Sequence, residues 1–151
     1  MPNLQLDFTK SYSVRVKRDL AKRFGEIYAD VMQTTPDLVD VTFRELGEGG
    51  LWRCGKSEPV PAVTLICDIR RGRPPEQGER LARALVDATV AALGLDPLLM
   101  SVEFTQHSGD EIYRNILIDG VARGGLSKDW SESEAAAPLV EALRAERRAD
   151  Y

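Results

Sequence analysis

The stretch TLICDIRRGRPPEQGERLARALVDATVAALGLDPLLMSVEF, residues 64–104, repeats an earlier stretch of the same chain. Residues 3–43, NLQLDFTKSYSVRVKRDLAKRFGEIYADVMQTTPDLVDVTF, align with it without a gap at a constant offset of 61 positions. The matched pairs include Leu4 with Leu65, Asp7 with Asp68, Leu20 with Leu81, Pro36 with Pro97, Leu38 with Leu99, Val41 with Val102 and Phe43 with Phe104. Internal similarity of this kind indicates a duplicated structural unit.

Each copy has the pattern of a strand followed by a helix. Apolar residues alternate over residues 4–8 and 63–69, which is the period of a half-buried strand. Apolar residues then recur at three- and four-residue steps over 16–31 and 81–92. That spacing predicts two helices, each with one apolar stripe that must cover a sheet.

A second strand is predicted after each helix. The helices should stop at Thr35–Pro36 and at Gly94–Pro97, because proline cannot continue a helix and glycine favours a left-handed cap. Strands then run over 39–43 and 100–104. Short strand-helix-strand units favour parallel crossovers, so the predicted fold is α+β, with a four-stranded sheet and both helices on one face.

The rest of the chain should add loops, short strands and a tail helix. Residues 47–61 form a glycine-rich hairpin or loop, and residues 108–130 carry short strand-like pieces between glycines. Ser131 with Glu134, or Ser133, can cap the tail helix, and Pro138 fits its first turn. We expect a single domain over 1–151, with repeat one at about 2–60, repeat two at about 61–125 and a tail over 126–151.

The sheet face away from the helices is expected to be apolar and to be covered by equivalent subunits. A small open sheet with a bare apolar face would otherwise aggregate. We therefore predict an oligomer.

Composition narrows the class of protein. A chain of 151 residues with 43% hydrophobic and 29% charged residues fits one globular domain. It has no apolar run near the roughly 18 to 20 residues of a membrane span and no signal peptide at its start, so we expect a cytoplasmic protein without a membrane partner. Two cysteines and one histidine predict no metal site. A net charge of -4 argues against nucleic acid as a partner, although Arg70, Arg71 and Arg73 form a local cationic cluster.

Pro2 follows Met1 directly and opens the first strand of the duplicated unit. A proline there, before a strand, a helix and a repeat, resembles the tautomerase superfamily, whose members use an amino-terminal proline. The stretch IRRGRPPEQGERL, residues 69–81, with Leu95–Pro97 and Ser101–Val102, resembles the turn, helix and second strand of 4-oxalocrotonate tautomerase. In length and duplication the chain is similar to cis-3-chloroacrylic acid dehalogenase and malonate semialdehyde decarboxylase, the fused members that assemble as trimers.

The resemblance covers roughly residues 2–125 and implies a homotrimer without cofactors, in which Pro2 is the catalytic base. Removal of Met1, which is usual before a small residue, would leave a secondary amine at Pro2. An α-amino group has a reference pKa of about 7.7 to 8.0, and burial beside arginines would lower it toward neutrality. Such a group can move a proton next to a carbonyl. Without the duplication, Pro2 would be read as a residue tolerated at the start of an edge strand.

Arg70 and Arg73 coincide with the arginine pair that holds the substrate carboxylate in the dehalogenase-like members. Guanidinium groups suit this task because they bind a carboxylate bidentately and stabilise a developing enolate. Arg71 alternates with both and should point away. The alternative is a solvated basic turn at the sheet edge.

Three further residues are candidates for substrate binding. Tyr28 and Glu103 replace a histidine and a tyrosine of the dehalogenase, and Trp52 lies where related proteins place an apolar residue against the substrate. Each has a structural alternative. Tyr28 can be a packing residue of its helix, Glu103 can pair with an arginine, and Trp52 can anchor an interface.

Water activation in the dehalogenase needs a glutamate, for which the nearest equivalents are Glu111 and Arg114. Hydrolytic dehalogenation is therefore in doubt. His107 and Tyr113 are expected in exposed loops without an assigned role.

The predicted function is a cofactor-free isomerase that tautomerises a small 2-oxo or enol carboxylic acid. A decarboxylase, hydratase or dehalogenase on the same scaffold is the enzymatic alternative, because all use an enolate-stabilising site. A non-catalytic ligand-binding homologue is the alternative from another class.

Overall fold

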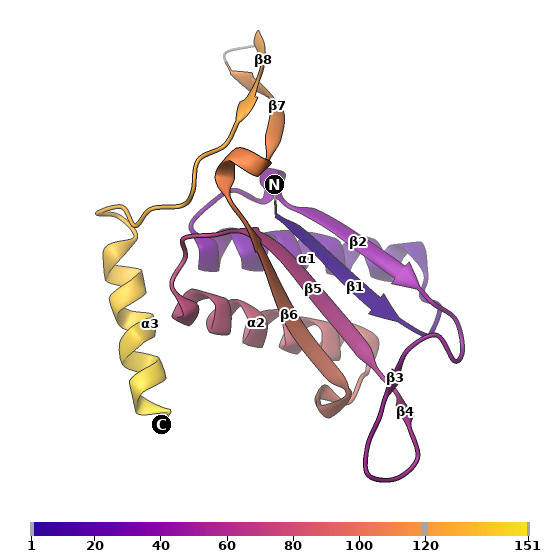
Figure 1. Cartoon of the computed structure of the whole chain (residues 1–151). Helices are drawn as coiled ribbons and strands as arrows, with labels where there is room; N and C mark the ends of the chain where they lie inside the picture. The colour runs from indigo at the N-terminus through magenta and orange to yellow at the C-terminus, as the bar shows by residue number, and fades with distance from the viewer. Residues whose placement is uncertain (1, 119–120, 151) are drawn as a thin grey trace.

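The computed structural model describes residues 2–118 and 121–150 (Figure 1). The first repeat folds as strand β1 (Asn3–Phe8), helix α1 (Val14–Met32), the 3-10 turn η1 (Pro36–Leu38) and strand β2 (Asp40–Glu45). The second folds as strand β5 (Val63–Arg70), helix α2 (Pro75–Leu93), the 3-10 turn η2 (Pro97–Leu99) and strand β6 (Met100–His107). The helices and turns of the two repeats begin and end 61 positions apart, so the duplicated unit expected from the sequence is present in the structure.

The four long strands form one mixed sheet in the order β2-β1-β5-β6. β1 is parallel to β2, β5 is parallel to β6, and β1 and β5 are antiparallel in the centre. Gln5 pairs with Ile66 at the middle of the central ladder, and these two positions are equivalent in the repeats. The repeats are therefore related by a local two-fold axis near this pair. Figure 1 shows α1 and α2 on one face of the sheet, so the predicted α+β fold is confirmed.

The core lies between the sheet and the two helices. Both central strands place every second side chain in it, and both helices contribute their apolar stripes. Its largest fully buried members are Leu4, Leu6, Phe8, Phe24, Tyr28, Met32, Leu65, Ile69, Leu81 and Leu85. Burying a side chain of this size stabilises the fold by about 1.5 to 3 kcal/mol. This cluster therefore supplies much of the free energy that holds the two helices against the sheet.

The opposite face of the sheet is polar, which corrects the prediction of an apolar face. The strand positions that alternate with the core are Asn3, Gln5, Asp7, Asp40, Thr42, Arg44, Thr64, Ile66, Asp68, Arg70, Ser101, Glu103, Thr105 and His107, and of these only Ile66 is apolar. Cross-strand polar contacts join them, such as the hydrogen bond that Thr105 Oγ1 donates to Asp68 Oδ1 at 2.9 Å. A sheet containing antiparallel pairing can leave one face in water, so no apolar surface needs a cover here.

The ends of α1 and α2 have identifiable caps, and one of the two predicted stop signals differs. Ser13 Oγ accepts a hydrogen bond from the amide of Val16 at 3.2 Å and caps α1. α2 ends at Gly94 in the left-handed conformation, φ 64°, as predicted. α1 ends at Gln33, φ 52°, before the Thr35–Pro36 signal is reached. The left-handed conformation of Gln33 therefore ends the helix before Pro36 is reached.

A short hairpin follows each repeat. Strands β3 (Trp52–Arg53) and β4 (Val60–Pro61) pair after the first, and β7 (Tyr113–Ile118) and β8 (Val121–Leu126) pair after the second. The tail helix α3 (Ala137–Ala149) has Pro138 in its first turn, as predicted. The predicted side-chain cap of this helix, by Ser131 with Glu134 or by Ser133, is wrong: the N-cap is Ala136, without a side-chain cap hydrogen bond. Ser133 Oγ instead accepts a hydrogen bond from the amide of Ala136 at 3.3 Å in the turn that precedes the helix.

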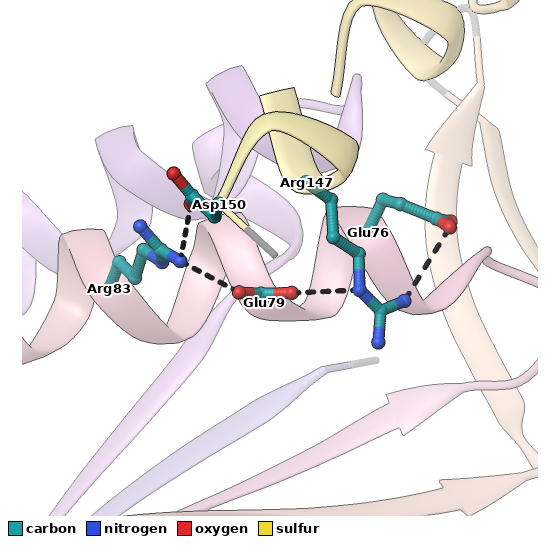
Figure 2. A network of polar contacts seen from close by, with 5 residues as sticks. All are labelled: Glu76, Glu79, Arg83, Arg147 and Asp150. Carbon is teal, nitrogen blue, oxygen red and sulfur yellow. Dashed lines mark hydrogen bonds and ion pairs between the residues drawn. The ribbon is translucent and has the colours of Figure 1, made fainter. Parts of the chain in front are cut away.

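Five charged side chains fasten α3 to α2 (Figure 2). Arg147 lies 3.1 Å from Glu79 and 3.5 Å from Glu76, while Arg83 lies 2.8 Å from both Glu79 and Asp150. Exposed ion pairs contribute little singly, about 0 to 1 kcal/mol each, but these share partners in a network. The tail is thereby held against the helix that follows the arginine-rich turn.

The two cysteines differ in burial, which predicts a difference in reactivity. Burial in the core raises the pKa of Cys67 to about 12, whereas Cys54 is exposed. Only the thiolate is nucleophilic, so Cys67 should stay unreactive throughout the range from pH 6 to 9. A thiol-reactive probe should label one cysteine per native chain and two after denaturation. Labelling of the native Cys54→Ser variant would show that the core around Cys67 is open.

Candidate active site

A cavity of about 170 Å³ opens where β1 begins and β5 ends. Its lining residues include Pro2, Tyr28, Arg70, Arg73 and Arg114, and Thr34 and Leu38 complete the wall. These residues come from the start of β1, helix α1, the end of β5, the turn before α2, strand β7 and the segment after α1. The cavity therefore brings together four residues predicted from the sequence and adds Arg114 from the second hairpin.

Pro2 is buried directly before β1, where it lines this cavity. Its carbonyl oxygen accepts a hydrogen bond from the amide of Asp40 at 3.0 Å, which fixes the start of β1 beside β2. Met1 lies outside the described residues, so its predicted removal stays a prediction. The pairing of β1 with β2 therefore fixes the position of the Pro2 ring nitrogen.

The three arginines give the cavity an excess of positive charge. Within the described residues, Arg70, Arg73 and Arg114 form no ion pair with a carboxylate, and no acidic residue lines the cavity. The Nε atoms of Arg73 and Arg114 are buried and have no hydrogen-bond partner in the described chain. Buried guanidinium donors without partners are costly, so the site is complementary to a small anion.

Arg73 is held from two sides. Its Nη2 donates a hydrogen bond to the carbonyl of Met32 at 3.3 Å, and its guanidinium carbon lies 5.5 Å from the ring centroid of Trp130. Burial lowers the pKa of Arg73, the neighbouring Tyr28 opposes this, and Arg70 adds to it. An arginine nevertheless stays charged in proteins, so Arg73 is an oriented cation with an unused donor.

Tyr28 is almost fully buried on α1 and reaches the same cavity. Burial raises the pKa of its hydroxyl, and the charges of Arg73, Arg70 and Arg114 work in the opposite direction. The hydroxyl therefore remains protonated at neutral pH. It can donate a hydrogen bond to a ligand oxygen while the arginines bind negative charge.

The segment that follows the second hairpin fixes the arginine turn. Asp129 accepts hydrogen bonds from Arg71 Nε at 3.2 Å and from the amide of Gly109 at 2.6 Å, and the amide of Trp130 donates to the carbonyl of Arg71 at 3.1 Å. Those two donors, the Gly109 amide first, lower the pKa of Asp129. A side chain on Gly72 would meet the Trp130 carbonyl oxygen at 2.2 Å, so only glycine fits there. Arg71 points away from the cavity, as predicted.

Comparison with known proteins places this geometry in a wider context. No protein-family model matches the chain, and no characterised protein matches it in sequence. Solved structures do. N1, a member of the cis-3-chloroacrylic acid dehalogenase family, is 22% identical over 95% of this chain and 99% of its own, with a TM-score of 0.69. Pt0534, inactivated by 2-oxo-3-pentynoate, is 18% identical over 80% of this chain and 95% of its own, with a TM-score of 0.65.

A fused 4-OT solved as a symmetric trimer is 17% identical over 80% of this chain and 94% of its own, with a TM-score of 0.65. The chain has the tautomerase fold. The fold expected from the resemblance is thereby confirmed, and the match to N1 includes nearly the whole chain.

Two predicted substrate-binding residues lie away from the cavity of this tautomerase fold. Glu103 is exposed on β6, on the polar face of the sheet, beside Ile66. Trp52 lies on β3, at the other end of the sheet in Figure 1, where its Nε1 donates a hydrogen bond to the carbonyl of Gly49 at 2.9 Å. Neither lines the cavity within its own chain, so a role in binding remains a prediction for both.

Of Glu111 and Arg114, only Arg114 lies at the cavity. The carboxylate of Glu111 accepts a hydrogen bond from the amide of Ser108 at 2.8 Å in a capping box, whereas Arg114 lines the cavity. His107 lies at the end of β6 with its Nδ1 2.9 Å from Asp68, so its expected place in an exposed loop is wrong. The strand simply runs further than its apolar pattern indicated. Tyr113 is exposed, but on β7.

Trp130 was missed by the sequence reading, and its contact with Arg73 predicts a measurable effect. A cation-π contact is worth about 0.5 to 2 kcal/mol, so Trp130→Ala should weaken binding of a small carboxylate such as benzoate by about two- to thirtyfold. Trp130→Phe should recover part of the loss. Leu98→Ala, an exposed residue of η2, is the matched control. Lower thermal stability with unchanged benzoate affinity would reduce Trp130 to a packing residue.

Proposed function

We propose that this chain is a cofactor-independent keto-enol tautomerase for a small 2-oxo or enol carboxylic acid. One observation carries the proposal: the amino-terminal proline shares a small cavity with three arginines that have no carboxylate partner among the described residues. A base and an anion-binding group are the two parts that such an isomerisation needs.

The chemistry follows from the placement of the groups. After loss of Met1, the Pro2 nitrogen is a secondary amine whose basicity burial and nearby cations lower. The neutral amine takes the proton from the carbon next to the substrate carbonyl. The electron pair of that C–H bond forms the C=C bond of the enolate, and the π pair of the carbonyl moves to its oxygen. Arg70, Arg73 and Arg114 bind the carboxylate and the developing enolate, and Tyr28 donates a hydrogen bond to the same oxygen. The prolinium ion then returns the proton at the other end of the enol system.

The lining of the cavity favours isomerisation over addition of water. A hydratase or hydrolytic dehalogenase needs a group that activates water, such as a histidine or a carboxylate. Arg114 lines the cavity, while Glu111 is engaged in its capping box. This chain therefore supplies an additional cation where those reactions need a base.

The assembly proposed for this enzyme is a homotrimer. Its support is now the trimeric fused 4-OT structures and the two repeats per chain, because the apolar face first expected is absent. Closed rings are the usual outcome of such repeated units. Sedimentation should give a mass of three chains at micromolar concentration, and a stable monomer would overturn this proposal.

Ketonisation of phenylenolpyruvate tests the proposed activity. The wild-type protein should catalyse it with a rate that rises with pH through the titration of the Pro2 amine. Pro2→Ala keeps a primary amine, so it should be slower, with a displaced pH profile. Treatment with 2-oxo-3-pentynoate, which inactivates Pt0534, should add the mass of one molecule at Pro2. A folded protein with a free Pro2 amine and no activity would instead support the ligand-binding alternative.

A further inference from the structure

A second cavity, of about 250 Å³, lies at the other end of β1 and β5. Its lining includes Phe8, Tyr12, Val63, Leu95 and Leu99. It shares no lining residue with the Pro2 cavity.

The local two-fold axis relates the two cavities. Equivalent elements of the repeats are 61 positions apart, and the pairing of Asn3 with Asp68 recurs as the pairing of Asp7 with Thr64. Under this relation the cavity residues correspond as follows: Pro2 with Val63, Thr34 with Leu95, Leu38 with Leu99, Arg70 with Thr9 and Arg73 with Tyr12. All five of these counterparts line the second cavity, whereas Thr89, the counterpart of Tyr28, does not. The second cavity is therefore the structural counterpart of the first.

The counterpart has lost the base and the arginines. The nitrogen of Val63 is in a peptide bond with Ala62, so it has no basic lone pair. Arg53, the counterpart of Arg114, does not line the cavity, because its guanidinium donates a hydrogen bond to the carbonyl of Leu98. The second cavity can neither move a proton from carbon nor bind a carboxylate bidentately.

The remaining lining is apolar and close to neutral. Lys10 and Asp96 carry its only charges, which are opposite, and Asp96 already accepts a hydrogen bond from the amide of Leu98 at 2.9 Å. The aromatic rings of Phe8 and Tyr12 meet edge to face, with centroids 5.2 Å apart. Largely apolar walls with the hydroxyl groups of Thr9 and Tyr12 suit a ligand with an apolar body and few polar groups.

We propose that the second cavity is a binding site for a small, neutral, largely apolar molecule and an inactive counterpart of the Pro2 cavity. The duplication thus leaves each chain with one charged site for chemistry and one neutral site for binding. Binding of neutral ligands follows from the lining of the second cavity alone. The expectation that carboxylates bind at the Pro2 cavity instead rests on the proposed function.

Benzyl alcohol and benzoate form a matched pair of probes for the wild-type protein. In amide NMR titrations, benzyl alcohol should shift residues 62–63 and 94–96 along a saturable curve, and benzoate should shift residues 70–73. Leu99→Phe, which fills the second cavity, should abolish the saturable response to benzyl alcohol and leave the benzoate response unchanged. Absence of a saturable benzyl alcohol response in the wild type, or equal shifts of the second cavity by benzoate, would overturn the proposal.

Restoring the arginines gives the converse test. The Thr9→Arg, Tyr12→Arg double variant should bind two benzoates per chain where the wild type binds one, as counted by calorimetry. Tyr12→Arg alone is the second variant should the double variant not fold, and it should give a saturable benzoate shift at residues 62–63 and 94–96 that the wild type lacks. Unchanged stoichiometry and affinity in folded variants would contradict the counterpart relation. Should benzoate bind nowhere in the wild type, the proposed function fails, while the benzyl alcohol result still decides this proposal.

Discussion

A protein in which Gly-Ser precedes Pro2 should tautomerise phenylenolpyruvate at least about a hundredfold more slowly than the protein with a free Pro2 amine. General base catalysis is worth about a hundred- to ten-thousandfold in rate, and the extension converts the amine into an amide without a basic lone pair. The cavity should otherwise be intact, because Pro2 is fixed through its carbonyl oxygen and not through its nitrogen. Initial rates at several pH values measure the effect.

Two controls keep this result specific to the base. Benzoate affinity of the extended protein reports whether the arginines still bind an anion, and intact mass confirms the state of each terminus. Pro2→Ala retains a primary amine and should fall between the two proteins in rate. If the extended protein with normal benzoate binding were as fast as the free one, Pro2 would be structural, and another group would have to be the base.

The fold could be predicted largely because the duplication repeats its own signals. A constant offset aligned two strands, two helices and two proline turns, and the structure keeps that offset through helices α1 and α2. The polar face of the sheet was misjudged although its residues were visible, because only Ile66 among the alternate strand positions is apolar. Apolar residues at every second position identify the buried face of a strand. They say nothing about the polarity of the opposite face, which depends on the residues in between.

The site could be predicted only as far as local sequence determines position. Arg70 and Arg73 sit at the end of a strand and in the turn after it, so their place follows from the strand itself. Arg114 reaches the cavity through a hairpin, and Trp130 reaches Arg73 through the segment after it. The lengths of these segments set the geometry, and their sequence does not reveal it. The local sequence indicated this contact only through Asp129 and Trp130. An acidic residue can pair with an arginine and an aromatic ring can stack on one, as these two do with Arg71 and Arg73.

Arg73→Ala should weaken carboxylate binding by about ten- to a hundredfold, whereas Arg71→Ala should change it by less than about threefold. Loss of a charged hydrogen-bonding partner costs roughly 1.5 to 3 kcal/mol. Arg73 lines the cavity with a buried, unpartnered Nε, while Arg71 is exposed and paired with Asp129. Calorimetric titration with benzoate measures both variants, and KM for the tautomerase substrate should follow the same order.

The comparison is informative because both variants remove one formal charge from the same turn. Long-range attraction, screened over a Debye length of about 8 Å at physiological salt, would act alike on both. The Arg71→Ala variant should also keep the turn in place, because the amide of Gly109 still binds Asp129 at 2.6 Å and the Arg71 carbonyl still accepts from Trp130. Unequal losses therefore identify direct binding by Arg73, and equal losses would reduce the turn to a general electrostatic patch.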